Sequence, residues 1–227
     1  MAKRLGSRKN ARSRDSRAKS RYEVLEQFDR RYIERGFDVI AGVDEAGRGA
    51  LAGPVVSAAV VLPGDSCLYG VDDSKHIAES DREELFDRIV ARATSIAIAF
   101  AQPGVIDREN ILRATLMTMH RAVDGLSVHP DLVIVDGRET FQWQGRMVAV
   151  TKGDTLSLSV AAASIVAKVA RDRAMRRLHR RYPRYNFKQN KGYGTKDHLE
   201  ALAVHGAADV HRQTFLAKIV EKNLTMF

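Results

Sequence analysis

The sequence of 227 residues predicts an α/β fold, in which helices flank a β-sheet. Two apolar runs, residues 39–42 and 55–61, are joined by a glycine-rich connection, as in neighbouring antiparallel strands. A continuous apolar run at residues 132–135 is typical of a buried central strand. Helical patterns lie between these runs, and a hydrophobic content of 44% supports one substantial core.

The N-terminal residues differ from the rest in charge. Residues 1–21 hold nine Lys or Arg against one acid, Asp15, so the remaining chain is almost neutral although the total charge is +9. Residues 1–20 also have few large apolar side chains, and we expect them to form a flexible arm, here called the basic arm. It would contact nucleic acid through phosphates, or it would be a solvated tail without a role.

The next elements follow from hydrophobic spacing. Apolar residues at helical spacing predict a helix over residues 21–35, ended by Gly36. Ser80 resembles the N-cap of a second helix with an acidic first turn. Residues 94–101 predict a third strand, and residues 106–123 one helix with Gly125 past its end.

The second half of the chain alternates strands and helices in the same way. Residues 131–136 and 147–150 read as strands, and a run of small residues from Ser157 predicts a helix packed close to the sheet. Two further helices are expected around residues 199–202 and 215–219. We divide the chain into the basic arm, a catalytic domain over residues 21–180 and a C-terminal helical extension over residues 181–227.

Several classes of protein are disfavoured. The single cysteine, Cys67, excludes an intramolecular disulfide framework and fits a reducing compartment. The sequence has no apolar stretch of about 20 residues and no secretory signal. We therefore expect a cytoplasmic protein that does not associate with a membrane. It also lacks a Cys/His zinc pattern and a phosphate-binding Gly-Lys-Ser/Thr loop, and His120 is better explained as an ordinary helical histidine than as a metal ligand.

Four acids lie at the ends of, or just after, the expected strands: Asp44, Glu45, Asp136 and Asp154. Such residues converge when their strands are neighbours. Clustered carboxylates repel one another unless cations neutralise them, and oxygen ligands favour Mg²⁺ or Mn²⁺. Two such ions about 4 Å apart would support phosphodiester cleavage. The alternative for the Asp44-Glu45 pair is an ordinary polar loop.

Two further features suit a nucleic-acid ligand. Arg48 lies between Gly47 and Gly49, so the backbone can approach a ligand while the guanidinium reaches a phosphate. Residues 168–196 hold eleven Lys or Arg, with aromatic residues interleaved. Such a run predicts a nucleic-acid groove, or else a solvated basic helix face.

The motifs and their order resemble those of bacterial type 2 ribonuclease H, the ribonuclease HII family, over about residues 38–215. The matching segments are Ile40-Ala41-Gly42-Val43-Asp44-Glu45-Ala46-Gly47-Arg48-Gly49, Asp73-Ser74-Lys75, Val135-Asp136-Gly137, Lys152-Gly153-Asp154, Ala161-Ala162-Ala163-Ser164-Ile165-Val166-Ala167-Lys168 and Lys191-Gly192-Tyr193-Gly194-Thr195. The resemblance implies a ribonuclease H-like mixed sheet flanked by helices, with a C-terminal helical extension. Ala50 stands where many members have proline, and the basic arm is not part of the family core.

The resemblance also implies roles for individual residues. Asp44, Glu45, Asp136 and Asp154 would be the catalytic, metal-binding acids. The remaining candidates would bind substrate: Gly47, Arg48 and Gly49 at the ribose 2′-hydroxyl, Tyr193 on the neighbouring deoxyribose, and Ser164 and Lys168 near the phosphates. The 2′-hydroxyl is the group that distinguishes RNA from DNA at such a site.

The implied activity is that of a monomeric endoribonuclease dependent on Mg²⁺ or Mn²⁺. It would cut the RNA strand of RNA–DNA hybrids and the 5′ side of single ribonucleotides in duplex DNA, leaving 3′-hydroxyl and 5′-phosphate ends, as ribonucleotide excision repair requires. The alternatives are another metal-dependent nuclease of the same fold and a non-catalytic hybrid-binding protein. A binding protein would gain nothing from four carboxylates that face phosphates.

Overall fold

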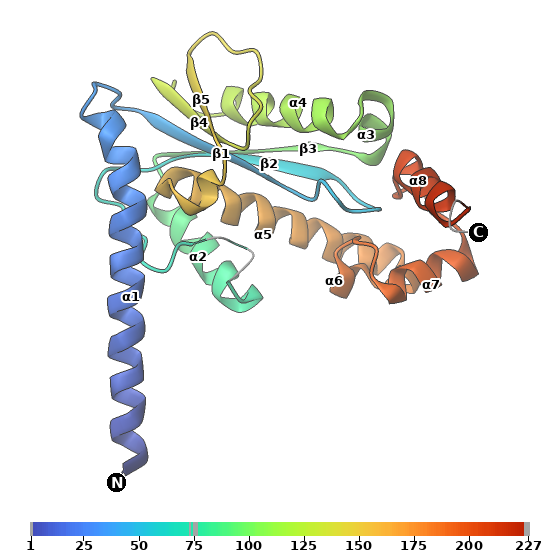
Figure 1. Ribbon diagram of the computed structural model, residues 1–227, viewed down its shortest axis with the longest axis horizontal. Coiled ribbons are helices and arrows are strands. Elements are labelled where there is room, and N and C mark those ends of the chain that lie inside the picture. Colours follow the sequence, from blue (N-terminus) through green and yellow to red (C-terminus); the bar gives the residue numbers. More distant parts are fainter. Residues whose placement is uncertain (1, 73, 75–76, 225–227) are drawn as a thin grey trace.

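The computed structural model describes residues 2–72, 74 and 77–224 and shows one five-stranded mixed sheet between helices (Figure 1). Its strands, in the order β3-β2-β1-β4-β5, are β1 (Ile40–Ala46), β2 (Val55–Val61), β3 (Ser95–Ala101), β4 (Leu132–Asp136) and β5 (Arg146–Val150). β1 pairs with β2 in antiparallel fashion and with β4 in parallel fashion. The α/β class and the antiparallel pair predicted from the sequence are confirmed.

Helices cover both faces of the sheet, with α4 on one side and α5 on the other (Figure 1). The α-helices are α1 (Ala2–Ile33), α2 (Glu79–Arg92), α3 (Pro103–Glu109), α4 (Ile111–Asp124), α5 (Leu158–Arg181), α6 (Phe187–Asn190), α7 (Lys196–His205) and α8 (Gln213–Leu224). Two 3₁₀ turns, η1 (Gly153–Thr155) and η2 (Pro183–Tyr185), flank α5 along the chain. Among the described residues, no helix is both long enough and apolar enough to span a bilayer.

The close packing of α5 on the sheet follows from its small residues. Ala161, Ala162 and Ala163 are completely buried in the core cluster that α5 forms with β2, α1 and α2. On β1, Gly42 lies so close to the helix that an added Cβ would be 2.0 Å from the carbonyl carbon of Ser159. Glycine on the strand and small residues on the helix therefore allow the approach that the sequence predicted.

The N-terminal stretch differs from the expectation. One helix, α1, covers the described part of the basic arm and continues to Ile33, so residue 20 is not a break in secondary structure. No proline interrupts this stretch, and Ala, Arg and Lys are good helix formers even where no apolar face is present. Burial begins near the expected boundary, at Tyr22 and Leu25. The predicted helix over residues 21–35 is confirmed, with Gly36 at a positive φ of 88° after its end.

Two other boundaries were predicted wrongly. The single helix expected over residues 106–123 is divided into α3 and α4 by Asn110, which has a φ of +68° and accepts a hydrogen bond from the Arg113 N–H at 3.1 Å. An asparagine in this conformation ends one helix and caps the next. α2 begins at Glu79 after Ala78, so Ser80 lies within its first turn instead of capping it.

Candidate active site

Two acids lie side by side where β1 and β4 run parallel. The strand register pairs Val43 with Val135, and Asp44 and Asp136 are the next residues on the two strands. Asp44 is only 5% exposed, and its Oδ1 accepts the N–H of Glu45 at 2.6 Å. Burial raises the pKa of Asp44 well above its usual value, and the charges of Glu45 and Asp136 raise it further. These three acids therefore form one electrostatic group.

The fourth acid, Asp154, is held beside this group by η1. The turn follows β5 and begins at Gly153, whose N–H donates to Asp136 Oδ1 at 2.6 Å. An added Cβ at Gly153 would lie 3.5 Å from the same oxygen, so the turn packs directly on Asp136. Asp154 is 4% exposed. Strand ends and a tight turn thus place all four predicted acids in one region.

The donor chemistry of this region suits a divalent cation. Asp44, Glu45 and Asp136 raise the electrostatic cost of charging one another, and a hard cation would offset that repulsion. Their carboxylate oxygens are the ligands that Mg²⁺ and Mn²⁺ prefer. In the present arrangement of the described residues, no group of three or more His, Cys, Asp or Glu side chains could hold a metal ion. The fit therefore rests on ligand type and charge.

Ser164 and Lys168 lie on α5 but have different surroundings. Ser164 is 4% exposed, and its hydroxyl hydrogen-bonds Ser74 Oγ at 2.9 Å and also Asp44, which lowers the pKa of Asp44 and partly offsets the effect of burial. The Nζ of Lys168 contacts both carboxylate oxygens of Asp172, at 2.6 and 2.8 Å. Ser164 thus lies against Asp44, one of the predicted catalytic acids, whereas Lys168 is engaged within its own helix. Asp73 and Lys75 of the expected motif lie outside the described residues.

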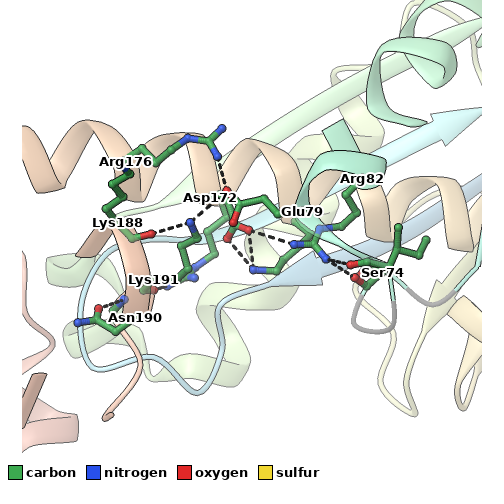
Figure 2. A network of polar contacts seen from close by, with 12 residues as sticks. Ser74, Glu79, Arg82, Asp172, Arg176, Lys188, Asn190 and Lys191 are labelled. Carbon is green, nitrogen blue, oxygen red and sulfur yellow. Dashed lines mark hydrogen bonds and ion pairs between the residues drawn. The ribbon is translucent and has the colours of Figure 1, made fainter. Parts of the chain in front are cut away.

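A network of polar contacts joins Ser74 and α2 to α5 (Figure 2). Arg82 Nη1 donates to the carbonyl oxygen of Ser74 at 2.7 Å, and Arg82 Nη2 lies 3.7 Å from Asp172 Oδ2. Ser74 in turn contacts Ser164, which reaches Asp44. Ser74 is therefore linked to Asp44 through Ser164 and to the buried Asp172 through Arg82.

The basic run of α5 is only partly available to a ligand. Arg173 and Arg176 form ion pairs with Glu83 of α2, and Arg176 also contacts Glu79 at 2.6 Å. Arg171 is completely buried. The prediction that this run forms a nucleic-acid groove therefore stays a prediction for the remaining basic residues. Arg173 and Arg176 hold α2 through ion pairs, and Arg171 supports backbone loops.

Two buried arginines support the Gly47-Arg48-Gly49 loop from below. Gly47 has a φ of +96°, and a Cβ there would lie 1.9 Å from Arg171 Nε. Arg212 donates to the carbonyl oxygens of Gly47 and Arg48 at 2.7 and 2.8 Å. By contrast, a Cβ at Gly49 would meet nothing within 4 Å, and the Arg48 side chain is 48% exposed, with Nη1 3.5 Å from Glu45 Oε1. The loop backbone is fixed while Arg48 faces solvent.

Tyr193 lies beside this loop. The N–H of Leu51, just after the glycine loop, donates to the Gly192 carbonyl at 2.8 Å. The Tyr193 ring is 37% exposed, and the Arg171 guanidinium carbon lies 5.2 Å from its centroid. The structure thus brings the two predicted substrate-binding segments together through Arg171, although 120 or more residues separate the glycine loop from that arginine.

A buried histidine pair holds the Tyr193 segment from the other side. His198 Nδ1 contacts the Tyr193 carbonyl at 2.8 Å, and the two Nε2 atoms of His198 and His211 are 3.1 Å apart. The Ala208 N–H donates to His211 Nδ1 at 3.0 Å. These contacts are satisfied together when both rings are neutral, with His211 donating to His198 and His198 donating to Tyr193. Burial lowers the pKa of both histidines, that of His211 to about 4.

Sequence reasoning missed four residues of this region: Arg171, Arg212, His198 and His211. Arg171 was counted as part of a surface run, and the other three lie in a segment read only as helical. Arg171 and Arg212 donate to backbone carbonyls at distant positions, which leave no local pattern in the chain. The two histidines bond each other across 13 residues, and neither belongs to a recognisable motif.

Comparisons with known proteins agree with the geometry. The family model described as ribonuclease HII matches residues 41–218. The ribonuclease HII of Syntrophus aciditrophicus is 48% identical over 194 residues, which cover 86% of this chain and 92% of that protein. That of Delftia acidovorans is 52% identical over 177 residues, covering 78% and 75% of the two chains.

Solved structures show the same fold. The ribonuclease H2 of Pyrococcus horikoshii matches with a TM-score of 0.69 and 27% identity, over 81% of this chain and 98% of that one. The ribonuclease HII of Archaeoglobus fulgidus, solved in complex with PCNA, matches with a TM-score of 0.67 and 28% identity, over 77% and 94%. The ribonuclease H-like sheet with C-terminal helices is confirmed. The chain belongs to the ribonuclease HII family and is a ribonuclease H endonuclease.

Proposed function

We propose that this endonuclease hydrolyses the RNA strand of RNA–DNA hybrids and the phosphodiester on the 5′ side of single ribonucleotides in duplex DNA. The products would carry 3′-hydroxyl and 5′-phosphate ends. The observation that carries the proposal is the buried Asp44, grouped with Glu45 and Asp136 beside the Gly47-Arg48-Gly49 loop. Acids for phosphodiester hydrolysis and a loop for reading the sugar lie next to each other.

The acids would hold Mg²⁺ or Mn²⁺, two ions during catalysis, with Asp44, Glu45, Asp136 and Asp154 as ligands. Bound ions of this kind supply Lewis-acid chemistry for phosphodiester hydrolysis. The chain itself orients the acids. Ser164 and the Glu45 N–H hold the Asp44 carboxylate, and the Gly153 N–H holds Asp136 Oδ1 at 2.6 Å. Burial of Asp44 and Asp154 keeps bulk water from the two carboxylates.

Recognition of the ribonucleotide would fall to the glycine loop and Tyr193. The fixed backbone of Gly47 and the exposed Arg48 would contact the 2′-hydroxyl and the adjacent phosphate, with Gly49 leaving room for close approach. Tyr193, more than a third exposed, would pack on the next deoxyribose and test that it lacks a 2′-hydroxyl. Ser164 and Lys168 would support the phosphates indirectly, through Asp44 and Asp172.

The cellular part of the proposal is ribonucleotide excision repair by a monomer in the cytoplasm. The curated relatives that match are named ribonuclease HII, and the single Cys67 suits a reducing compartment. Substrates would be RNA–DNA hybrids and ribonucleotide-containing duplex DNA.

The test is cleavage of three labelled duplexes by the natural chain: all DNA, DNA with one ribonucleotide, and a continuous RNA–DNA hybrid. Each is incubated with Mg²⁺, with Mn²⁺ or with chelator, and the products are mapped at nucleotide resolution. We expect metal-dependent cuts on the 5′ side of the ribonucleotide and within the hybrid RNA. Cleavage of the all-DNA duplex would favour another nuclease of the same fold, and binding without cleavage would favour a hybrid-binding protein.

A further inference from the structure

We propose that the basic arm is a second binding element for double-stranded nucleic acid, which contacts the duplex flanking the position that is cut. The inference rests on the proposed function, because it assumes a duplex substrate at the active site. Three observations carry it: the charge of the arm, its attachment beside η1 and its direction within one continuous helix.

The positive charge of the molecule is concentrated in the arm. Its Lys and Arg residues, against the single Asp15, are Lys3, Arg4, Arg8, Lys9, Arg12, Arg14, Arg17 and Lys19. Elsewhere the charges nearly balance, and Arg173 and Arg176 of α5 form ion pairs with Glu79 and Glu83. A dense basic segment binds nucleic-acid phosphates without regard to sequence, through the release of counterions.

The arm lies outside the part of the chain that the family model matches, residues 41–218. It nevertheless starts from a firmly attached base. Tyr22 and Leu25 are buried in the core, and Asp29 Oδ2 accepts the Ser159 N–H and hydroxyl, both at 2.8 Å, in the first turn of α5. The second half of α1 is thus part of the folded body.

Arg21 places the C-terminal end of the arm next to the candidate active site. Its Nε donates to Asp72 Oδ1 at 2.9 Å, and its Nη2 donates to the carbonyl of Thr155, also at 2.9 Å. Thr155 follows Asp154 in η1. Arg17, one helical turn before Arg21, lines a cavity of about 520 Å³ together with Asp72 and Arg88. Arg17 of the arm is therefore one helical turn from a residue that contacts η1.

The direction of the arm suits a duplex. α1 is continuous from Ala2 to Ile33, and its N-terminal part projects from the body (Figure 1). Nineteen residues of helix span roughly 28 Å, the length of about eight base pairs. The arm has no Phe, Tyr or Trp on which an unpaired base could stack. Phosphates of a duplex are the ligand that this composition favours, and a duplex extending from the cut position offers them.

The experiment compares three full-length chains: the natural one, a neutral variant and a charge-retaining control. The neutral variant replaces the eight Lys and Arg of the arm by Gln, and the control exchanges each Lys for Arg and each Arg for Lys. Each cuts a duplex of about 12 base pairs and one of about 40, with one central ribonucleotide, over a series of salt concentrations. Circular dichroism and urea unfolding confirm that all three fold.

We expect the neutral variant to raise the KM of the long duplex at least about tenfold at low salt, with kcat unchanged and a smaller effect on the short duplex. The slope of log KM against log salt should become shallower by about 0.9 for each lost phosphate contact. The control should behave like the natural chain. A variant with only Arg8, Lys9, Arg12 and Arg14 changed to Gln should give an intermediate KM, and it replaces the full variant if that one fails to fold.

Equal KM values and equal salt slopes for the natural and neutral chains would overturn the inference. If the natural chain cuts neither ribonucleotide duplex, it is the proposed function that fails. Intact cleavage with an unchanged KM in the neutral variant refutes the arm alone.

Discussion

Asp44 is the buried acid at the centre of the candidate site, and its surroundings make its negative charge costly. It is 5% exposed, and both its burial and its acidic neighbours raise its pKa. A carboxylate in such surroundings is costly to keep charged unless something offsets the charge. Within the described residues, the Ser164 hydroxyl and the Glu45 N–H lower this pKa and offset part of the cost. A bound cation would offset more of it, as the proposed role of Asp44 as a metal ligand requires.

Arg48 is predicted to act in recognition without stabilising the fold. Its side chain is half exposed, and the loop is held instead through its carbonyls by Arg212. Arg48→Ala should therefore lower kcat/KM at a single ribonucleotide by about tenfold or more, since a charge-assisted contact to the substrate is lost. Urea unfolding should change by no more than about 0.5 kcal/mol.

The matched control for that variant is Arg108→Ala, since Arg108 is an exposed arginine on α3. It should leave both the cleavage rate and the unfolding free energy unchanged. Full cleavage activity in Arg48→Ala would remove Arg48 from the recognition of the substrate.

At the level of single residues, the approach of Asp44 and Asp136 could be predicted from the sequence, whereas the burial of Arg171 could not. Asp44 and Asp136 stand at the ends of recognisable strands, so their approach followed from the strand pattern. Arg171 stands in a run of basic residues most of which are at least partly exposed, and no local sequence feature indicates that Arg171 is completely buried. Burial depends on distant loops, here those of Gly47 and Tyr193.

Among the secondary-structure elements, the contact of β1 with α5 is the most sensitive to added volume. A Cβ at Gly42 would lie within 2.3 Å of three backbone atoms of Ser159 and Val160, which cannot turn away as a side chain can. Gly42→Ala should therefore destabilise the protein by about 1–3 kcal/mol or more, through overpacking. Chemical unfolding in urea measures the change.

Gly64→Ala provides the comparison, because a Cβ there would meet nothing within 4 Å and the backbone has no positive φ. Its unfolding free energy should stay within about 0.5 kcal/mol of the natural value. Equal stability of the Gly42 and Gly64 variants would contradict the close packing of β1 on α5.

The histidine pair that joins α7 to the segment before α8 permits a test by substitution. Gln at position 211 can keep a donor toward His198, whereas Asn is too short and retains only an acceptor toward the Ala208 N–H. His211→Asn should thus cost about 1–3 kcal/mol of stability, because a buried His198 nitrogen loses its partner. His211→Gln should cost less, and urea unfolding of both variants decides between them. The reverse order of stability would exclude the neutral pair.

The same pair predicts a pH dependence of stability. Folding lowers the pKa of His211 from its ordinary value of 6.5 to about 4, so between these values the unfolded chain binds the additional proton. The stability of the folded chain is therefore unaffected by this titration above about pH 6.5. It decreases as the pH falls toward 4, by up to about 1.4 kcal/mol per pH unit.

Burial raises the pKa of Asp29, so its protonation at lower pH favours the folded chain and opposes the effect of His211. The comparison must therefore be with His211→Gln, which lacks only the titrating group at 211. The natural chain should lose stability faster than this variant between pH 6.5 and 4.5. Parallel curves in urea unfolding would show that His211 titrates normally.

Element types followed from hydrophobic periodicity, and boundaries did so less reliably. Asn110 interrupts a stripe that continues in the sequence, because its backbone turns to a positive φ while the apolar spacing resumes in α4. α1 extends through residues without an apolar face. Their helix propensity is sufficient there, because no other structure competes with the helix. Both differences arise where local backbone preference, and not burial, decides the conformation.

For the whole molecule, six motifs in order were sufficient to indicate the fold and the family, and the match over residues 41–218 confirms the family. The contacts that assemble the site were not visible in the sequence. Arg212 lies 164 residues from Arg48 in the chain, and Arg21 reaches Thr155 across 134 residues. Such pairs depend on the folded topology, which places α1 and the C-terminal helices at opposite ends of α5 (Figure 1).

The measurement that tests the central claim most directly is the cleavage rate of a duplex with one ribonucleotide for the natural chain, Asp44→Asn and Asp65→Asn. Asp65 is an exposed loop acid and serves as the matched control, and circular dichroism checks that each chain folds. With Mg²⁺ present, the Asp44 variant should lose at least about a hundredfold in rate, while the Asp65 variant should cut normally. A folded Asp44→Asn chain that cuts at the natural rate would contradict the assignment of the catalytic centre to Asp44, Glu45, Asp136 and Asp154.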